Sequence, residues 1–270
     1  MGVRNLEYPK ETTNTVKRYN AHAVYALETI HRIVNSSQIL HVSFNTPSQP
    51  FPVTLPMIGQ MGSFDRPSAD LGDPLELYLH GYVSSRLMNT CKDSTSGDST
   101  PAGPKGMPVC IAASHVDGLV LTLTSYSHNY NYRSSVLFGY ATHVTDEEEK
   151  LYAMELITNS VVPDRWRHTR LPPTKAEIQS TGILKVRIAS GSAKISAGQA
   201  SDDKSDMANE AMLDSTWTGV LPIYQTMGAP VPSSYNRVDL PDYVSEFAND
   251  YNTDNMELSL DAAKGERRAL

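Results

Sequence analysis

The sequence has little cysteine and no long apolar run. Its 270 residues include only Cys91 and Cys110, which excludes a dense disulfide framework but leaves one bond between these two open. Residues 1–20 are polar and contain no apolar segment of the kind found in signal peptides. Nowhere do about 18 apolar residues follow one another, so we expect no membrane span. Together these absences predict a soluble cytoplasmic protein.

An excess of basic residues is also missing. The formal net charge is -7 and the isoelectric point is about 5.6. Because phosphate backbones attract basic surfaces, we expect no nucleic-acid partner. The GxSxG elbow of serine hydrolases and the GxGxxG fingerprint of Rossmann folds are absent as well. Hydrolysis by that route and nicotinamide binding by that fold are therefore not supported.

Closely spaced histidine pairs are a further absence. Five histidines lie on predicted strands or strand ends, namely His41, His80, His115, His128 and His143. Imidazole is a frequent metal and haem ligand, so a metal or haem site stays open. None of the five shows an HxH or HExxH spacing, and we therefore predict no metal site.

What is present is a pattern of one helix followed by many strands. Apolar spacing predicts a helix over 21–34, strands over 38–44, 51–58 and 75–81, and a serine-capped helix over 84–91. Later segments continue this alternation of strands and inserted helices. The order of elements indicates an α+β protein, an antiparallel β-barrel with peripheral helices.

Short sequence signals predict turns and helix caps in the second half of the chain. Asp117-Gly118 is typical of a hairpin turn. Thr145 with Glu148, and likewise Thr174 with Glu177, has the spacing of a capping box at a helix start. The segments 182–191 and 193–198 are expected as a final pair of strands.

Composition divides the chain into three parts. Residues 1–19 form an N-terminal arm, residues 20–225 a single barrel domain, and residues 226–270 a polar C-terminal tail. Within the barrel domain, residues 91–106 are rich in Ser, Gly and Pro, which predicts a mobile surface insertion.

Two polar clusters have the composition of a phosphate site. In LYLHGYVSSRL, a strand end is followed by Ser84, Ser85 and Arg86 at a helix start. Hydroxyls, free backbone N–H groups and a guanidinium at such a start favour an anion. The stretch SHNYNYRSSVLFG, residues 127–139, adds Asn131, Arg133 and Ser134. If the strands are neighbours, we expect both arginines to face one phosphate.

Simpler interpretations of these residues stay open. Arg86 and Arg133 could be solvated surface residues, and His80 could be a core histidine with satisfied hydrogen bonds. The alternating residues Tyr126, Tyr130 and Tyr132 share one face of an extended chain and could form a core or interface stripe.

Seven motifs in order carry a family resemblance. They are PVTLPM, LYLHGYVSSRL, PVCIAASHVDGLVLT, HNYNYRSSVLFG, TDEEEK, VPDRWRHTRLPPTKAEI and WTGVLP, spread over roughly residues 20–224. Together they resemble the pyridoxamine 5'-phosphate oxidase-like FMN-binding split barrels, in particular the flavin-nucleotide-binding subgroup that includes the nitroimidazole-resistance proteins. The resemblance implies an antiparallel split barrel.

The resemblance also implies where a flavin would bind, across the interface of a homodimer. Backbone groups would meet its pyrimidine edge near Thr54, Leu55, Pro56 and Met57. The ring or ribityl chain would lie beside His80 and Gly81. There His80 could donate a proton to a reduced substrate, or hydrogen-bond the flavin without taking part in the chemistry. The phosphate would be held by Ser84, Ser85 and Arg86, completed by Asn131, Arg133 and Ser134. Trp217 would cover the site from the partner subunit.

The function implied is an FMN-dependent oxidoreductase, with FAD as an alternative cofactor. It would act on a small organic molecule and be reduced by NAD(P)H, the flavin supplying the electron chemistry. The strand PVTLPM lacks the flanking basic residues of pyridoxamine 5'-phosphate oxidase, which does not favour vitamin B6 oxidation. A flavin- or haem-binding carrier or sensor without turnover is the alternative.

Overall fold

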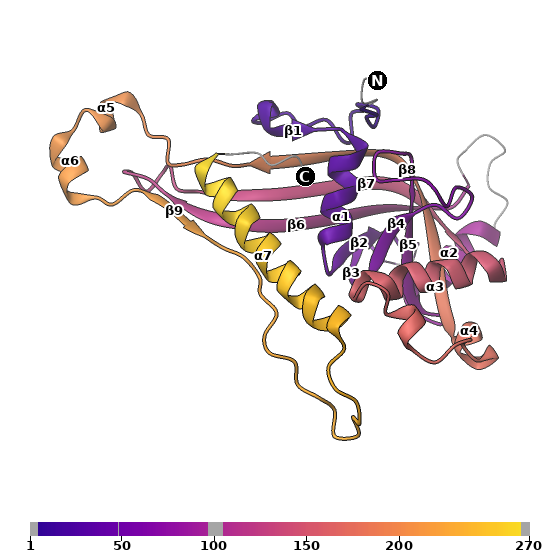
Figure 1. The fold of residues 1–270 in the computed structure, drawn as a ribbon. Coiled ribbons are helices and arrows are strands. Elements are labelled where there is room, and N and C mark those ends of the chain that lie inside the picture. The colour runs from indigo at the N-terminus through magenta and orange to yellow at the C-terminus, as the bar shows by residue number, and fades with distance from the viewer. Residues whose placement is uncertain (1–4, 48, 97–104, 266–270) are drawn as a thin grey trace. The chain divides into compact units, whose positions relative to one another are not determined.

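The computed structural model of the chain describes residues 5–47, 49–96 and 105–265 (Figure 1). Contacts divide the chain into two compact units. Unit 1 comprises Met1–Ser114 and Ser134–Lys194, and unit 2 comprises His115–Arg133 and Ile195–Leu270. Three long strands continue from one unit into the other.

A sheet of nine strands forms the framework of the described residues. The strands are β1 (Ala23–Val24), β2 (Leu40–Phe44), β3 (Val53–Met57), β4 (Gly59–Gly62), β5 (Glu76–Tyr82), β6 (Met107–Leu121), β7 (Asn129–His143), β8 (Thr181–Ser196) and β9 (Gly219–Pro222). Their order is β3-β2-β6-β7-β8-β5-β4, with β1 beside β8 and β9 beside β6. This antiparallel sheet does not close on itself, which confirms the predicted split barrel.

Helices precede, interrupt and follow the strands along the described chain. They are α1 (Leu27–Ser36), α2 (Arg86–Ser96), α3 (Glu147–Val161), α4 (Lys175–Ser180), α5 (Lys204–Met207), α6 (Glu210–Ser215) and α7 (Asp242–Lys264), with short 3-10 turns at Asn20–His22 and Trp166–His168. In unit 1, α1 packs on β4, and α3 packs on β4 and β5. None of the helices in the described ranges combines the length and apolar character that crossing a membrane requires.

Three local predictions were wrong. Asp117-Gly118 is not a turn but lies inside β6, where Gly118 pairs with Pro222 of β9. The expected final pair of strands is one continuous strand, β8. The first expected capping box is displaced by one residue, because Asp146 rather than Thr145 caps α3 by accepting from the Glu149 N–H.

One local prediction was confirmed, and another concerns a segment that lies partly outside the described residues. The second capping box is confirmed, since Thr174 and Glu177 exchange both hydrogen bonds at the start of α4. Helix α2 continues through Ser96, into the segment expected as an insertion at 91–106. Residues 97–104 of that insertion lie outside the described residues.

The core of unit 1 includes a cluster between α3 and the sheet. Tyr78, Val144, Ala153, Ile157 and Ile183 are buried together there. The Tyr78 hydroxyl donates to Glu149 Oε1 at 2.8 Å, and Lys185 Nζ lies 2.6 Å from the same oxygen. The buried carboxylate therefore has both a hydrogen-bond donor and a counter-charge, as burial demands.

A buried histidine of α1, His31, forms a hydrogen bond with the N-terminal segment. His31 Nε2 lies 2.6 Å from the Tyr8 hydroxyl, and His31 Nδ1 lies 2.8 Å from the Leu71 carbonyl oxygen. Because a carbonyl only accepts, Nδ1–H donates to Leu71 and Nε2 accepts from Tyr8. His31 is completely buried, and burial lowers its pKa to about 4.

This histidine predicts a loss of stability in mild acid. The unfolded chain protonates a histidine below about pH 6.5, whereas folded His31 does so only near pH 4. The unfolded state therefore binds more protons in this window, and the free energy of unfolding falls by up to about 3 kcal/mol as the pH is lowered through it. Urea unfolding at several pH values measures this slope. The variant His31→Gln should lose it, and equal slopes in both proteins would contradict the assignment.

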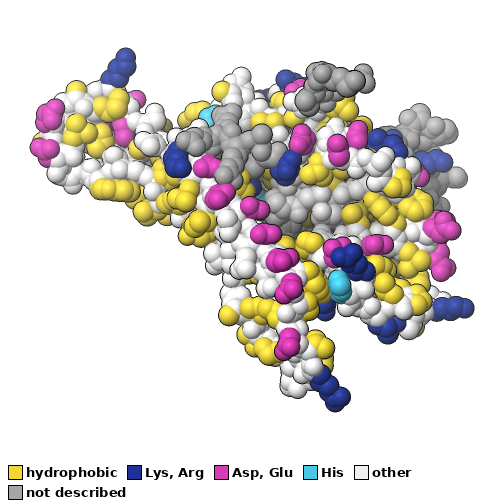
Figure 2. Space-filling view, in the orientation of Figure 1, with side chains coloured by type: hydrophobic (Ala, Val, Ile, Leu, Met, Phe, Trp, Pro, Cys, Tyr) yellow, Lys and Arg dark blue, Asp and Glu magenta, His cyan; other side chains and the backbone are white. Residues whose placement is uncertain are grey.

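Unit 2 contains a long helix where a polar tail was expected. Helix α7 carries carboxylates three or four residues apart along one face, and Figure 2 shows them as a row of acidic side chains. They are Asp242, Glu246, Asp250, Asp254, Glu257 and Asp261. Near its end, Ser259 is buried and donates to the Asp117 carbonyl oxygen at 2.7 Å. The helix is thereby joined to β6.

Candidate functional site

Three of the predicted site residues meet where β3, β5 and α2 come together. A Cβ atom added to Gly81 would lie 3.1 Å from Met88 Cε, 3.5 Å from Met57 Cε and 3.8 Å from Ser85 Oγ. Because Gly81 has no side chain, β5, the end of β3 and the start of α2 can approach one another closely there. This inward side is filled by the two methionines, so it has no room for a ring.

The opposite side of the same strands is open to solvent. Successive residues of a strand point to opposite faces, so His80 points away from the Gly81 side. His80, Thr54 and Pro56 are exposed, whereas Leu55 and Met57 are half-buried. Partial burial still lowers the pKa of His80 below its ordinary value. A flat ligand at this corner therefore has Thr54, Pro56 and His80 available as side chains, and only the backbone of Leu55, Met57 and Gly81.

Strand β3 is an edge of the sheet. It pairs with β2, where Ser43 Oγ and Thr54 Oγ1 lie 2.9 Å apart, and no strand of the described residues pairs with its other side. Proline at position 56 suits an edge, because it has no N–H to contribute to a ladder. An edge presents unpaired backbone groups, which can bind a ligand.

Arg86 borders a cavity of about 360 Å³ at the first turn of α2. Within the described part of the chain its exposed guanidinium forms no hydrogen bond or ion pair. The cavity is lined by Thr46, Pro47, Gln49, Arg86, Thr90, Asp93 and Ser94. Thr46 is 7% exposed, and its Oγ1 has no hydrogen-bond partner among the described residues. A free cation beside an unsatisfied buried hydroxyl fits an anion.

The serines before this cavity are placed at the helix start as predicted. Ser85 Oγ lies 3.5 Å from the Met88 N–H, and the Ser84 carbonyl accepts from Asn89 Nδ2 at 3.1 Å. The first N–H groups of α2 lie beside the guanidinium, an arrangement that favours anions. Sequence reasoning missed Thr46 and Thr90, since one lies in the β2–β3 connection and the other among ordinary helix residues.

The side chains of the second predicted cluster, Asn131, Arg133 and Ser134, all form hydrogen bonds to other groups of the protein. Arg133 Nε and Nη2 donate to the two carboxylate oxygens of Asp117 at 2.9 and 2.8 Å, and both side chains are buried. Asn131 Nδ2 donates to the Gly198 carbonyl at 2.9 Å, and Ser134 Oγ to that of Lys194 at 3.1 Å. The expected free guanidinium at position 133 is therefore already neutralised. Asp117 was overlooked because it was assigned to a turn.

Several aromatic side chains of unit 2 are exposed. Trp217 is 62% exposed, Tyr126 95% and Tyr130 52%. The ring of Trp217 lies against Gly219, where an added Cβ would come within 2.7 Å of it. A core stripe of Tyr126, Tyr130 and Tyr132 is therefore wrong for the first two residues.

The open antiparallel sheet and its helices define an α+β split barrel, and comparison with known proteins gives the family. The family model described as pyridoxamine 5'-phosphate oxidase matches residues 27–195, more than half of the chain. The chain therefore belongs to the pyridoxamine 5'-phosphate oxidase family, as its motifs predicted. None of the curated protein sequences compared with the chain matches it significantly.

Two solved structures are similar over nearly their whole length. The flavocytochrome Anf3 from Azotobacter vinelandii is 27% identical, with a TM-score of 0.71, and the match covers 90% of this chain and 99% of that one. A FAD- and haem-binding protein from Mycobacterium smegmatis is 22% identical, with a TM-score of 0.66, and the match covers 84% and 97%. Both matches extend beyond the segment 27–195.

Proposed function

We propose that the chain binds a flavin at the corner of β3, β5 and α2 and works as a flavin-dependent oxidoreductase. The observation that carries this proposal is the unpartnered Arg86 in a cavity beside the exposed edge of β3. Membership of the pyridoxamine 5'-phosphate oxidase family and the likeness to a flavocytochrome support it.

The residues present fit a flavin nucleotide. Arg86, the unsatisfied Thr46 hydroxyl and the first N–H groups of α2 would bind the phosphate. The edge of β3, with Thr54 and Pro56, would orient the ring against the exposed face. A bound flavin supplies hydride or single-electron transfer. His80 is exposed on that face as the candidate proton donor, and partial burial lowers its pKa below the ordinary value.

A second copy of the chain would cover the ring. Phe51, Ile58 and Tyr82 are 77%, 38% and 65% exposed around this face. Large apolar side chains gathered beside a polar site mark an interaction surface. A homodimer would bury them and exclude water from the flavin, which strengthens the electrostatic contacts within the site.

Turnover is tested by mixing the flavin-loaded protein with NADPH or NADH in the absence of oxygen. We expect flavin absorbance to bleach with at least one of the two, followed by reoxidation when a small organic acceptor is added. A flavin that stays oxidised with both nicotinamides, and with a panel of donor substrates, would support the alternative of a carrier or sensor.

Haem is a second candidate ligand. The flavocytochrome matches 90% of the chain, so the likeness includes residues beyond 195. His128 does not suit a haem ligand through Nε2, because its Nδ1 accepts from the Thr122 N–H at 3.1 Å and the proton stays on Nε2. Adding haemin and recording the Soret band tests the candidate. A stoichiometric band shift is expected, and an unchanged spectrum of free haemin would contradict haem binding.

A further inference from the structure

A cavity of unit 1 lies beside the connection between α3 and β8. This connection, residues 162–180, contains the short Trp166–His168 turn and α4 (Figure 1). It includes the whole motif VPDRWRHTRLPPTKAEI, no part of which belongs to the proposed flavin site. Together with Met154 of α3 and Thr181 of β8, it borders a cavity of about 410 Å³. This volume falls in the range of about 300–1,000 Å³ that is typical of small-molecule sites.

Four of the side chains that line the cavity present carbon surface. Met154, Trp166 and Pro173 are half-buried, and Leu171 is 43% exposed. An indole ring offers a large flat apolar surface, on which another aromatic ring can stack or pack edge to face. A methionine side chain adapts to irregular shapes and makes favourable contacts between its sulfur and a ring. This lining therefore favours an aromatic ligand.

The polar side chains that line the cavity already have partners within the protein. Arg170 Nη2 donates to the two carboxylate oxygens of Glu177 at 2.5 and 2.6 Å. Thr169 Oγ1 donates to the Trp166 carbonyl oxygen at 2.8 Å, and Thr181 Oγ1 to that of Glu177 at 2.9 Å. The guanidinium is thus neutralised, and both hydroxyl protons are used. Since a charged ligand would lose water without gaining a free counter-charge, the cavity favours an uncharged one.

Hydrogen bonds fix the walls of the cavity before any ligand binds. The Trp166 backbone N–H donates to Asn159 Oδ1 at 2.9 Å, which joins the turn to α3. Thr174 and Glu177 form the capping box of α4, and the same Glu177 accepts from Arg170. A site that is formed in advance has less conformational freedom to lose on binding.

We propose that this cavity binds a small uncharged aromatic molecule, packed against the ring of Trp166. The cavity shares no lining residue with the one beside Arg86. It is therefore a second binding site, and its existence does not depend on whether the protein binds a flavin.

The test is titration calorimetry of the purified full-length protein with two probes of similar shape, indole-3-acetamide and indole-3-acetate. We expect saturable binding of the neutral amide, and binding of the anionic acetate weaker by about fivefold or more, because its charge finds no free partner. Trp166→Ala should weaken amide binding roughly tenfold or more, since the ring supplies buried area and the aromatic contact.

Leu171→Ala provides a second variant of the same cavity, at a side chain that is largely outside the core. It should weaken amide binding by about threefold, through the loss of apolar contact area. It keeps the proposal testable if Trp166→Ala fails to fold.

Glu177→Gln tests why charge is excluded. Glutamine can take the same place in a capping box, so the start of α4 is retained. The guanidinium of Arg170 loses its carboxylate partner. Indole-3-acetate should then bind at least as tightly as the amide, whereas an unchanged preference for the amide would contradict the proposed reason.

Controls separate this site from the flavin corner. Leu213→Ala, at an exposed leucine of α6, and Arg86→Ala should leave amide affinity unchanged, and so should an excess of FMN. An affinity lost in Arg86→Ala or on addition of FMN would place the amide at the flavin corner and overturn the proposal.

Three further results would also overturn it. They are absence of saturable amide binding, an affinity kept in both Trp166→Ala and Leu171→Ala, and equal affinities of the unaltered protein for the two probes. An amide affinity that falls as the protein concentration rises would show instead that a second copy of the chain occupies the cavity.

Discussion

Arg86→Ala is expected to weaken flavin binding by roughly ten- to a hundredfold. A charge-assisted hydrogen bond contributes about 1.5–3 kcal/mol, and about 1.4 kcal/mol corresponds to a factor of ten in the dissociation constant. The guanidinium has no partner among the described residues, so its removal leaves no orphaned group behind. Fluorescence titration of the apoprotein with FMN and FAD measures the change.

Two variants control this experiment. Arg167→Ala removes an arginine whose ion pair with Asp164 is largely exposed, and it should leave flavin affinity unchanged. Thr46→Val removes the unsatisfied hydroxyl while keeping the shape of the side chain, and a smaller loss of affinity is expected. Equal dissociation constants for Arg86→Ala and the unaltered protein would place the phosphate elsewhere.

Arg133→Ala is expected to destabilise the protein by about 3–5 kcal/mol, the usual result of leaving one member of a buried ion pair uncompensated. The two side chains are 10% and 5% exposed, so solvent cannot replace the lost partner of Asp117. Since Ser259 donates to the Asp117 carbonyl, amide exchange in the second half of α7 should accelerate as well. Urea unfolding and hydrogen exchange measure the two effects.

A paired substitution separates charge from packing. Replacing both partners, as in Arg133→Met with Asp117→Leu, removes the uncompensated charge and should recover much of the lost stability. Arg167→Ala, at an exposed pair, should cost less than about 1 kcal/mol. If Arg133→Ala were no more destabilising than Arg167→Ala, the buried pair would not have the structural role assigned to it.

The class of fold and the position of Arg86 at a helix start could be predicted because both depend on local signals. The motif order indicated the split barrel, and Ser85-Arg86 at a helix start is a feature of neighbouring residues. Because successive residues of a strand point to opposite faces, the sequence also predicts that His80 and Gly81 face opposite sides of β5.

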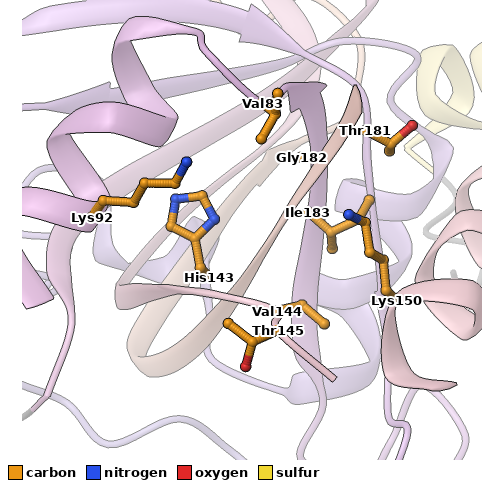
Figure 3. A pocket seen from close by; sticks show the side chains of 9 residues that line it. All are labelled: Val83, Lys92, His143, Val144, Thr145, Lys150, Thr181, Gly182 and Ile183. Atoms are coloured by element: carbon orange, nitrogen blue, oxygen red, sulfur yellow. The ribbon is translucent and has the colours of Figure 1, made fainter. Parts of the chain in front are cut away.

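Features that depend on strand register could not be predicted. Asp117 and Arg133 meet only because β6 continues through Asp117-Gly118, where pairing with β9 overrides the local turn signal. A cavity of about 280 Å³ in unit 1 brings together Lys92, His143 and Lys150 from three separate elements (Figure 3). Their convergence results from the packing of α2 and α3 on the sheet, which no spacing in the sequence encodes.

The most direct test of the central claim is an absorbance spectrum of the purified protein, with mass identification of what denaturation releases. The account predicts the absorption bands of an oxidised flavin in the near-ultraviolet and visible regions. Denaturation should release FMN or FAD, up to one molecule per chain. A colourless protein that also fails to bind added FMN or FAD in titration would contradict it.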